Sequence, residues 1–144
     1  RLGGIVARLS NVIGSGMSKN NVLSDIFRQL PIEGSLKIRN TKPIQDFIWI
    51  EDAADALISL LKKDISGTYN IGSGAGTSIN KLIEKALNYE GQNDREVIST
   101  IKNSDFSYSV LNVEKIKKAT GWKPKHSLSQ SLKKMLNSNQ KNVE

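Results

Sequence analysis

The stretch QDFIWIED, residues 45–52, decides the fold because it predicts a strand that runs directly into a helix. Phe47–Ile50 is an apolar, aromatic and β-branched run, which is typical of a buried strand. Glu51 and Asp52 then place carboxylates where a helix N-terminus favours negative charge. The apolar residues that follow recur at helical spacing and predict one apolar helix face: Ala54, Leu57, Ile58 and Leu61.

Size and composition are those of one globular domain. The chain has 144 residues, of which 38% are hydrophobic and 24% charged. It has no cysteine, which excludes disulfides and thiolate metal sites, and its one histidine, His126, argues against a histidine metal cluster or a histidine-containing triad. No apolar run approaches the roughly 20 residues that span a bilayer. We therefore expect a cytoplasmic protein with no membrane partner.

The net charge of +7 raises the question of nucleic-acid binding. Many lysines, however, lie in the predicted helical segments 81–85, 115–118 and 133–134, where they alternate with apolar positions. This pattern is typical of a solvated helix face, so we expect no nucleic-acid partner. A net positive charge would equally suit the binding of a small anionic ligand such as a nucleotide phosphate.

Short strands alternate with helices along the chain, which predicts an α/β fold. Besides the strand of the opening stretch, we expect strands at Ile5–Leu9, Leu36–Arg39, Thr68–Ile71 and Glu96–Ile101. Besides the helix after Ile50, we expect helices that begin at Asn20 or Asn21, at Ser78, at Asn112 and at Ser127, the last with a Ser127/Gln130 capping box.

The limits of the chain suggest a partial domain. Residues 1–144 show no internal repeat or long linker and are expected to form a single unit, with 137–144 as a disordered tail. The chain begins at Arg1 and enters a strand almost at once, so we expect a piece of something longer. The strands at Ile5–Leu9 and Thr68–Ile71 would then expose apolar edges, and we expect the isolated chain to self-associate.

Two glycine clusters resemble phosphate-binding loops only loosely. Gly72-Ser73-Gly74-Ala75-Gly76 follows a strand and precedes a capped helix, but its spacing is GxGxG and not GxGxxG. Gly14-Ser15-Gly16 lacks a third glycine. In dinucleotide-binding folds, an Asp or Glu at the end of a strand about 20 residues later binds the ribose hydroxyls. Neither cluster is followed by an acidic residue that is well placed for this role. We therefore favour a strand-to-helix turn over a cofactor site at residues 72–76.

No catalytic group can be assigned. Redox chemistry by a tyrosine–lysine pair requires Tyr-x-x-x-Lys on a helix, but the residues four positions after the three tyrosines are Ser73, Asn93 and Asn112. Helix capping accounts for Glu51 and Asp52 without catalysis. His126 lies in a polar turn and is expected at the surface.

A few polar residues could line a ligand site. Asn11 follows a predicted strand, Asn21 opens a helix, and Lys102 and Asp105 share a loop. Asparagine amides offer two donors and two acceptors, which suits sugar hydroxyls and uracil-like edges, and Lys102 offers a point charge for phosphate. Spacing alone leaves open whether each residue is functional.

Four segments together resemble the C-terminal half of an extended short-chain dehydrogenase/reductase of the nucleotide-sugar epimerase/dehydratase family. Residues 8–14 (RLSNVIG) are similar to that family's RxxNVYGP, and residues 45–52 resemble RDFIYVDD. Residues 69–79 match YNIGSGxxxSI, and residues 121–124 match the late LGWxP. The resemblance covers Ile5 to Leu136 and implies a Rossmann-type fold with a small mixed α/β substrate-binding domain.

The resemblance also implies roles for individual residues. The asparagine matching Asn11 hydrogen-bonds a nucleoside-diphosphate sugar, and the segment matching Asn21 and Val22 lies against its sugar and phosphates. The strand residues matching Leu36 and Ile38, with the residue matching Ile79, border the base. The pair matching Lys102 and Asp105 holds diphosphate and ribose.

Two residues depart from the family pattern. Gln45 stands where relatives carry a diphosphate-binding arginine, and Lys102 replaces another arginine. A neutral amide cannot make the two parallel, charge-assisted hydrogen bonds that an arginine guanidinium makes to a phosphate. The ammonium of lysine carries the charge but lacks this paired geometry. The usual substrate or its binding mode is therefore in question.

The resemblance implies the substrate-binding portion of an NAD(P)-dependent epimerase, dehydratase or ketoreductase, which we expect in bacterial surface-polysaccharide synthesis. The family's glycine-rich loop and Tyr-x-x-x-Lys pair would belong to a missing N-terminal Rossmann half. NAD or NADP would bind in the parent enzyme, a homo-oligomer, and not to this chain alone. The alternative is a stand-alone, non-catalytic nucleotide- or sugar-binding module from a split or decayed gene.

Overall fold

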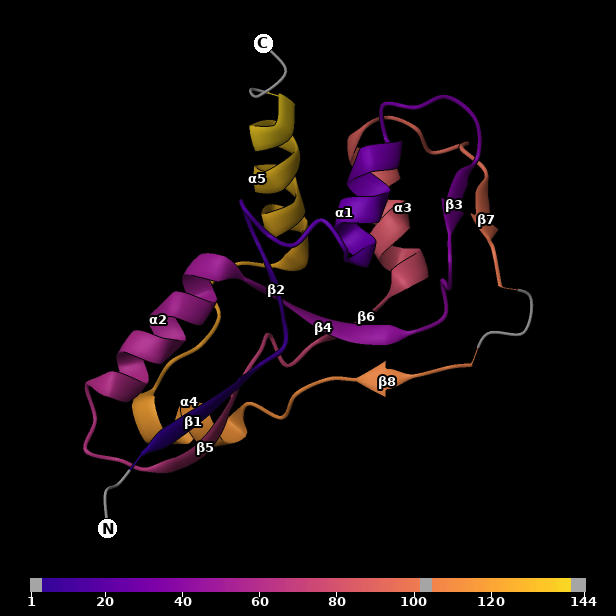
Figure 1. The fold of residues 1–144 in the computed structure, drawn as a ribbon. Coiled ribbons are helices and arrows are strands. Elements are labelled where there is room, and N and C mark those ends of the chain that lie inside the picture. Colours follow the sequence, from indigo (N-terminus) through magenta and orange to yellow (C-terminus); the bar gives the residue numbers. More distant parts are fainter. Residues whose placement is uncertain (1–3, 102–104, 141–144) are drawn as a thin grey trace.

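The computed structural model describes residues 4–101 and 105–140 and confirms a mixed α/β fold (Figure 1). Its strands are β1 (Ile5–Leu9), β2 (Asn11–Ile13), β3 (Leu36–Ile38), β4 (Ile44–Trp49), β5 (Gly67–Ile71), β6 (Gly76–Ser78), β7 (Val97–Ser99) and β8 (Tyr108–Ser109). Its helices are α1 (Val22–Gln29), α2 (Ile50–Leu61), α3 (Ile79–Tyr89), α4 (Glu114–Thr120) and α5 (Leu128–Gln140). Across these described ranges, no helix is long and apolar enough to cross a membrane.

Strand β4 is the centre of the arrangement. It pairs in parallel with β2, with Asn11 opposite Phe47, and in parallel with β8. Its first half also pairs antiparallel with β6, with Gln45 opposite Thr77. Two further parallel pairs, β1 with β5 and β3 with β7, lie on either side of this sheet (Figure 1). The opening stretch of the sequence therefore forms the strand that joins the parts of the fold.

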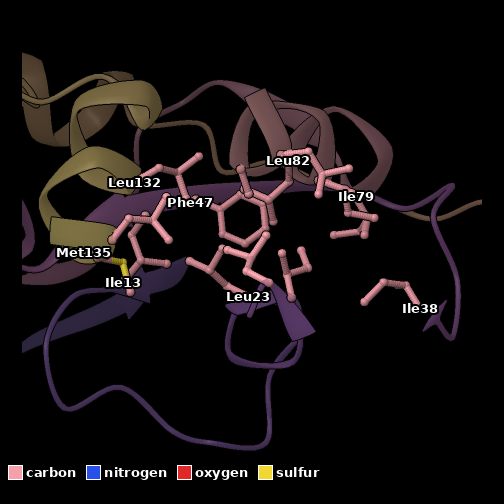
Figure 2. Packing of buried hydrophobic residues seen from close by; sticks show 14 of the residues in the cluster. Ile13, Leu23, Ile38, Phe47, Ile79, Leu82, Leu132 and Met135 are labelled. Atoms are coloured by element: carbon pink, nitrogen blue, oxygen red, sulfur yellow. The ribbon is translucent and has the colours of Figure 1, made fainter. Parts of the chain in front are cut away.

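Alternation along β4 divides the interior into two hydrophobic clusters, as expected for a strand buried on both faces. Phe47 and Trp49 belong to what we call the β4–α3 cluster, which α1, α3 and α5 cover. Figure 2 shows the ring of Phe47 among Leu23, Leu82 and Leu132. Ile48 belongs to the second cluster, here the β5–α2 cluster, whose buried members are Ile48, Ala53, Ala56, Leu60, Tyr69, Ile71, Val113, Ile116 and Trp122.

Helix α2 buries a different face from the one that its large apolar residues suggest. Ala53, Ala56 and Leu60 face the β5–α2 cluster. The apolar face predicted from spacing is instead exposed, with Leu61 79% exposed and Leu57 and Ile58 also at the surface. Strand β1 contacts α2 and exposes Val6 and Leu9. We call these five exposed residues together, Val6, Leu9, Leu57, Ile58 and Leu61, the open apolar face, although strand alternation points Val6 and Leu9 to opposite sides of β1.

Several local predictions are confirmed by the structure. Ser78 caps α3 by accepting from Lys81 N–H, and Ser127 and Gln130 form the expected reciprocal capping box. Helix α4 ends at Gly121, whose φ of 75° is left-handed. Three short strands, β2, β6 and β8, were not predicted. Helix α5 continues through Gln140, so residues 137–140 of the predicted disordered tail are helical, and residues 141–144 lie outside the described residues.

Candidate functional site

A hollow of about 660 Å³ lies where β2 ends and the loop to α1 begins. Its walls come from the end of β2 and this loop, the start of α1, and strand β4. The residues that line it are Ser10 through Ser18, Asn21, Val22, Leu23, Gln45, Phe47 and Ile50. Backbone amides, hydroxyls and asparagine amides mixed with apolar side chains make this a surface for a polar organic molecule.

A second hollow of about 490 Å³ lies between the start of α1 and the end of β3. Its lining residues are Lys19, Asn20, Asn21, Val22, Asp25, Arg28, Ile38, Arg39, Asn40, Pro43, Gln45 and Ile79. Asn21, Val22 and Gln45 line both hollows. The two hollows therefore adjoin, and we refer to them together as the groove.

Asn11 lies at one end of the groove, in the first hollow. Its side-chain NH₂ donates to the backbone oxygen of Asp46 at 3.0 Å, so the neighbouring strand β4 fixes the orientation of the amide. The side-chain oxygen remains able to accept from a ligand hydroxyl. Its place in the groove agrees with the predicted site, while its contact with a ligand stays a prediction.

Asn21 lies at the junction of the two hollows and organises the loop beside it. Its side-chain oxygen accepts from Ser24 N–H at 2.9 Å and so caps α1, which settles the earlier choice between Asn20 and Asn21. Its NH₂ donates to Ser18 O at 2.6 Å. The first-turn amides of Val22 and Leu23 have no partner within the helix, so this helix start favours an anion in the groove.

Ile38 and Ile79 form an apolar border of the second hollow, as the resemblance implied for a base-binding surface. Both side chains are almost fully buried in the β4–α3 cluster and also line the second hollow. Leu36 does not fit the prediction. It is fully buried in the same cluster and lines neither hollow, because successive inward-facing residues of β3 lie at different depths from the groove.

The predicted diphosphate and ribose pair is only partly described. Lys102 lies outside the described residues. Asp105 is exposed and lines neither hollow, but its backbone oxygen accepts from the Asn40 side chain at 3.1 Å. Because Asn40 lines the second hollow, this bond places the loop next to the groove.

The glycine-rich turn after β5 binds an anion, and the anion is Asp46 of β4. Its carboxylate accepts from Ser73 N–H at 2.8 Å and from Gly74 N–H at 3.0 Å, and also from the Ser73 hydroxyl. A Cβ at Gly72 would lie 2.5 Å from an Asp46 oxygen, which explains the glycine there. The turn therefore does not fit a cofactor diphosphate, since its amides already hold a buried carboxylate.

A second buried carboxylate, Asp52, changes the predicted role of His126. Asp52 is 1% exposed and accepts from His126 N–H at 2.9 Å, with the ring Nδ1 at 3.0 Å. The ring Nε2 lies 2.9 Å from Lys134 Nζ. A neutral imidazole with its proton on Nδ1 satisfies both partners, because a carboxylate only accepts and an ammonium only donates.

His126 is therefore not a free surface residue, and Asp52 does more than stabilise the start of α2. Their hydrogen bonds hold the segment that precedes α5 against α2. Neither residue lines the groove, so the pair does not act on a molecule bound there.

The resolved pKa shifts belong to surface ion pairs away from the groove. The hydrogen bond from Lys125 lowers the pKa of Asp55, and the same contact raises the pKa of Lys125. The bond from Lys117 likewise lowers the pKa of Glu114. Among the described residues, no group of histidine, aspartate and glutamate could hold a metal ion.

Comparison with known proteins identifies the family. The model of the GDP-mannose 4,6-dehydratase family matches residues 4–135, nearly the whole chain. The chain belongs to this family. The resemblance to extended short-chain dehydrogenase/reductases of the nucleotide-sugar epimerase/dehydratase type is thereby confirmed.

Individual relatives agree with the family. The dTDP-L-rhamnose 4-epimerase of Burkholderia thailandensis is 27% identical over 88% of this chain and 37% of its own length. The structure of RMD from Pseudomonas aeruginosa with NADPH superimposes with a TM-score of 0.88 at 26% identity, over 96% of this chain and 49% of that one. UDP-glucose 4-epimerase from Thermotoga maritima with UDP-glucose gives a TM-score of 0.83 at 27% identity, over 99% and 48%.

The chain thus spans about half the length or less of the relatives that it matches. The two solved structures are complexes with NADPH and with UDP-glucose, respectively. The part of the family fold that is present here carries the groove.

Proposed function

We propose that this chain is the substrate-binding portion of an NAD(P)-dependent epimerase, dehydratase or ketoreductase that acts on a nucleoside-diphosphate sugar. Its parent enzyme would work in the cytoplasm, in bacterial surface-polysaccharide synthesis. The base would lie against Ile38 and Ile79, the diphosphate would pass Asn21, Val22 and Gln45, and the sugar would approach Asn11.

The groove is the observation that carries this proposal. Its two hollows adjoin at Asn21, Val22 and Gln45, so one extended ligand can occupy both. The second hollow offers an apolar border suited to a base, and the first offers polar groups suited to a sugar. Between them lies the start of α1, whose unpaired amides favour phosphate. This order of surfaces matches the order of parts in a nucleoside-diphosphate sugar.

The cofactor would bind elsewhere, in a Rossmann half that this chain lacks. The described glycine turn is occupied by Asp46, and no Tyr-x-x-x-Lys pair is present in the sequence. NAD or NADP would accept or return the hydride, and this chain would orient the sugar. In the complete enzyme, we expect that half to cover the open apolar face on β1 and α2.

Calorimetric titration of the chain with UDP-glucose, GDP-mannose and dTDP-glucose tests the proposal. Because described residues of this chain line both hollows, we expect one-to-one binding of at least one of the three. The matching free sugars serve as controls and should give no heat. Absence of binding for all three at millimolar concentration would contradict the proposal.

The open apolar face favours a portion of an enzyme over the stand-alone binding module. Large apolar side chains exposed on β1 and α2, two elements in contact, indicate a surface that another part of a protein covers. In a module that functions alone, they would promote aggregation. Reading the gene upstream of the Arg1 codon separates the two. We expect a glycine-rich loop and a Tyr-x-x-x-Lys pair there, and a frame with neither would favour the module.

A further inference from the structure

The groove lacks a cation at the place where the resemblance implies one. Gln45 lies on β4 at the junction of the two hollows, where a diphosphate would pass. Its side chain is a neutral amide, which can donate hydrogen bonds but cannot balance phosphate charge. Lys102, which the resemblance also assigns to the diphosphate, lies outside the described residues. In the described part of the groove, a nearby cation could take the place of the charge that is missing at Gln45.

Three cationic side chains line the second hollow next to Gln45, namely Lys19, Arg28 and Arg39. Arg28 donates to the Asp25 carboxylate, which lines the same hollow, so this pair is neutral as a whole. The Arg39 guanidinium makes no hydrogen bond or ion pair with any residue between 4–101 or 105–140. Arg39 is therefore a cation without a partner among the described residues, and it lines the same hollow as Gln45.

The backbone holds Arg39 in a defined place. It follows β3 directly, and its carbonyl accepts from Ile101 N–H at 3.2 Å and from the Ser99 hydroxyl at 3.3 Å. The preceding residue, Ile38, is buried in the β4–α3 cluster. Lys19 lies instead in the loop before α1 and carries a compact ammonium, whereas the planar guanidinium of arginine can bind two phosphate oxygens at once.

We propose that Arg39 supplies the diphosphate-binding charge that Gln45 lacks. This inference rests on the proposed function and names a residue within it. The diphosphate is held from the β3 side of the groove, by Arg39 together with the first amides of α1. Gln45 contributes only neutral hydrogen bonds from the β4 side.

Calorimetry with UDP, GDP and dTDP, each beside its nucleoside, tests this assignment. For the diphosphate that binds wild type, Arg39→Ala should weaken binding about tenfold to hundredfold, the usual effect of losing a charge-assisted hydrogen bond. Binding of the nucleoside should not change, because it has no phosphate. Lys37→Ala is the matched control, since Lys37 is exposed on β3 and lines neither hollow.

A double variant tests whether the two positions serve the same phosphate group. In Arg39→Ala/Gln45→Arg, β4 supplies a guanidinium to the groove. We expect this double variant to bind the diphosphate at least tenfold more tightly than Arg39→Ala does. Circular dichroism and thermal unfolding of each variant establish that it is folded, which the exposed position of Arg39 favours.

The outcomes separate this inference from the function on which it rests. If wild type binds a diphosphate and Arg39→Ala binds it equally well, the assignment of Arg39 is wrong and the proposed function stands. An equal loss in Lys37→Ala, or no recovery in the double variant, also overturns the assignment. If wild type binds none of the three diphosphates, both proposals fail.

Discussion

The two hydrophobic clusters of this chain differ in how completely they are covered. In the β4–α3 cluster, Leu23, Ile26 and Leu82 are fully buried beneath α1, α3 and α5. Around the β5–α2 cluster, α2 buries Ala53, Ala56 and Leu60 but leaves Leu57, Ile58 and Leu61 exposed, and β1 exposes Val6 and Leu9. The β4–α3 cluster is covered by helices, whereas β1 and α2 carry uncovered apolar side chains.

Parallel strands explain the difference. A parallel sheet is normally covered on both faces and buries its inner strands. Within the described residues, β1 pairs only with β5, on one of its two edges. A further strand beside β1 and a helix against α2 would complete this sheet.

Truncation of one leucine in each region should give the largest contrast. We expect Leu82→Ala to lower the free energy of unfolding by about 2–5 kcal/mol, because it leaves a cavity in a closed core. Leu61→Ala should change it by no more than about 0.5 kcal/mol, because Leu61 is exposed. Urea unfolding measures both, and equal losses would remove the distinction between the regions.

The buried carboxylate of Asp46 should come next, since it joins the groove strand β4 to the turn after β5. Asp46→Asn places an NH₂ group where N–H donors point, so we expect a loss of about 1–3 kcal/mol in the free energy of unfolding. Asp64→Asn, at an exposed aspartate after α2, is the control and should have little effect. A small loss in both would mean that the turn does not depend on Asp46.

Self-association should depend on the open apolar face. We expect the isolated chain to form oligomers at high concentration, and Ile58→Lys/Leu61→Lys to shift it towards monomer with little change in stability. Ile32→Lys is the matched control, because Ile32 is an exposed apolar residue outside this face. Light scattering measures the mass. A monodisperse wild-type monomer, or an equal shift in the control, would contradict this prediction.

The smallest effect concerns pH and the α2 surface. Lys125 lowers the pKa of Asp55 in the folded chain, so the folded state binds this proton less readily than the unfolded state. The stabilisation is present above the ordinary aspartate pKa and is lost as pH falls through the lowered value. Lys125→Ala should therefore flatten the acid limb of the stability curve slightly, whereas Lys63→Ala should not. Urea midpoints measured across the acid range provide the test.

The sequence predicts the elements well where local chemistry decides them. Residues 45–52 form the predicted strand and helix, and Asn21, Ser78 and Ser127 cap the helices that they precede. Strands β2, β6 and β8 were missed, although β3 and β7, which also have three residues, were predicted. The three missed strands all pair with β4, a contact that the local sequence pattern does not show.

The orientation of α2 could not be predicted from periodicity. The helix is apolar on two sides, with Ala53, Ala56 and Leu60 on one and Leu57, Ile58 and Leu61 on the other. Both sets have helical spacing, and the larger side chains indicated the wrong buried face. Among the described residues, nothing covers the larger set.

Long-range bonds explain the other differences. The acceptors of His126 and of the glycine turn, Asp52 and Asp46, are distant in sequence, so spacing gave no sign of either contact. For the site, motif resemblance led to Asn11, Asn21, Val22, Gln45, Ile38 and Ile79, all of which line the groove. It did not indicate Arg39, whose relevance appears only because the end of β3 and strand β4 line the same hollow.

Hydrogen exchange with and without a bound nucleoside-diphosphate sugar tests the central claim most directly. The claim is that a ligand in the groove contacts mainly the loop before α1, the start of α1 and the region from β3 to β4, and not the exposed apolar residues of β1 and α2. We predict that saturation with whichever of UDP-glucose, GDP-mannose or dTDP-glucose binds will slow exchange at residues 14–23 and 38–45 and leave β1 and the exposed face of α2 unchanged. Protection confined to β1 and α2, or protection in neither region, would contradict the account.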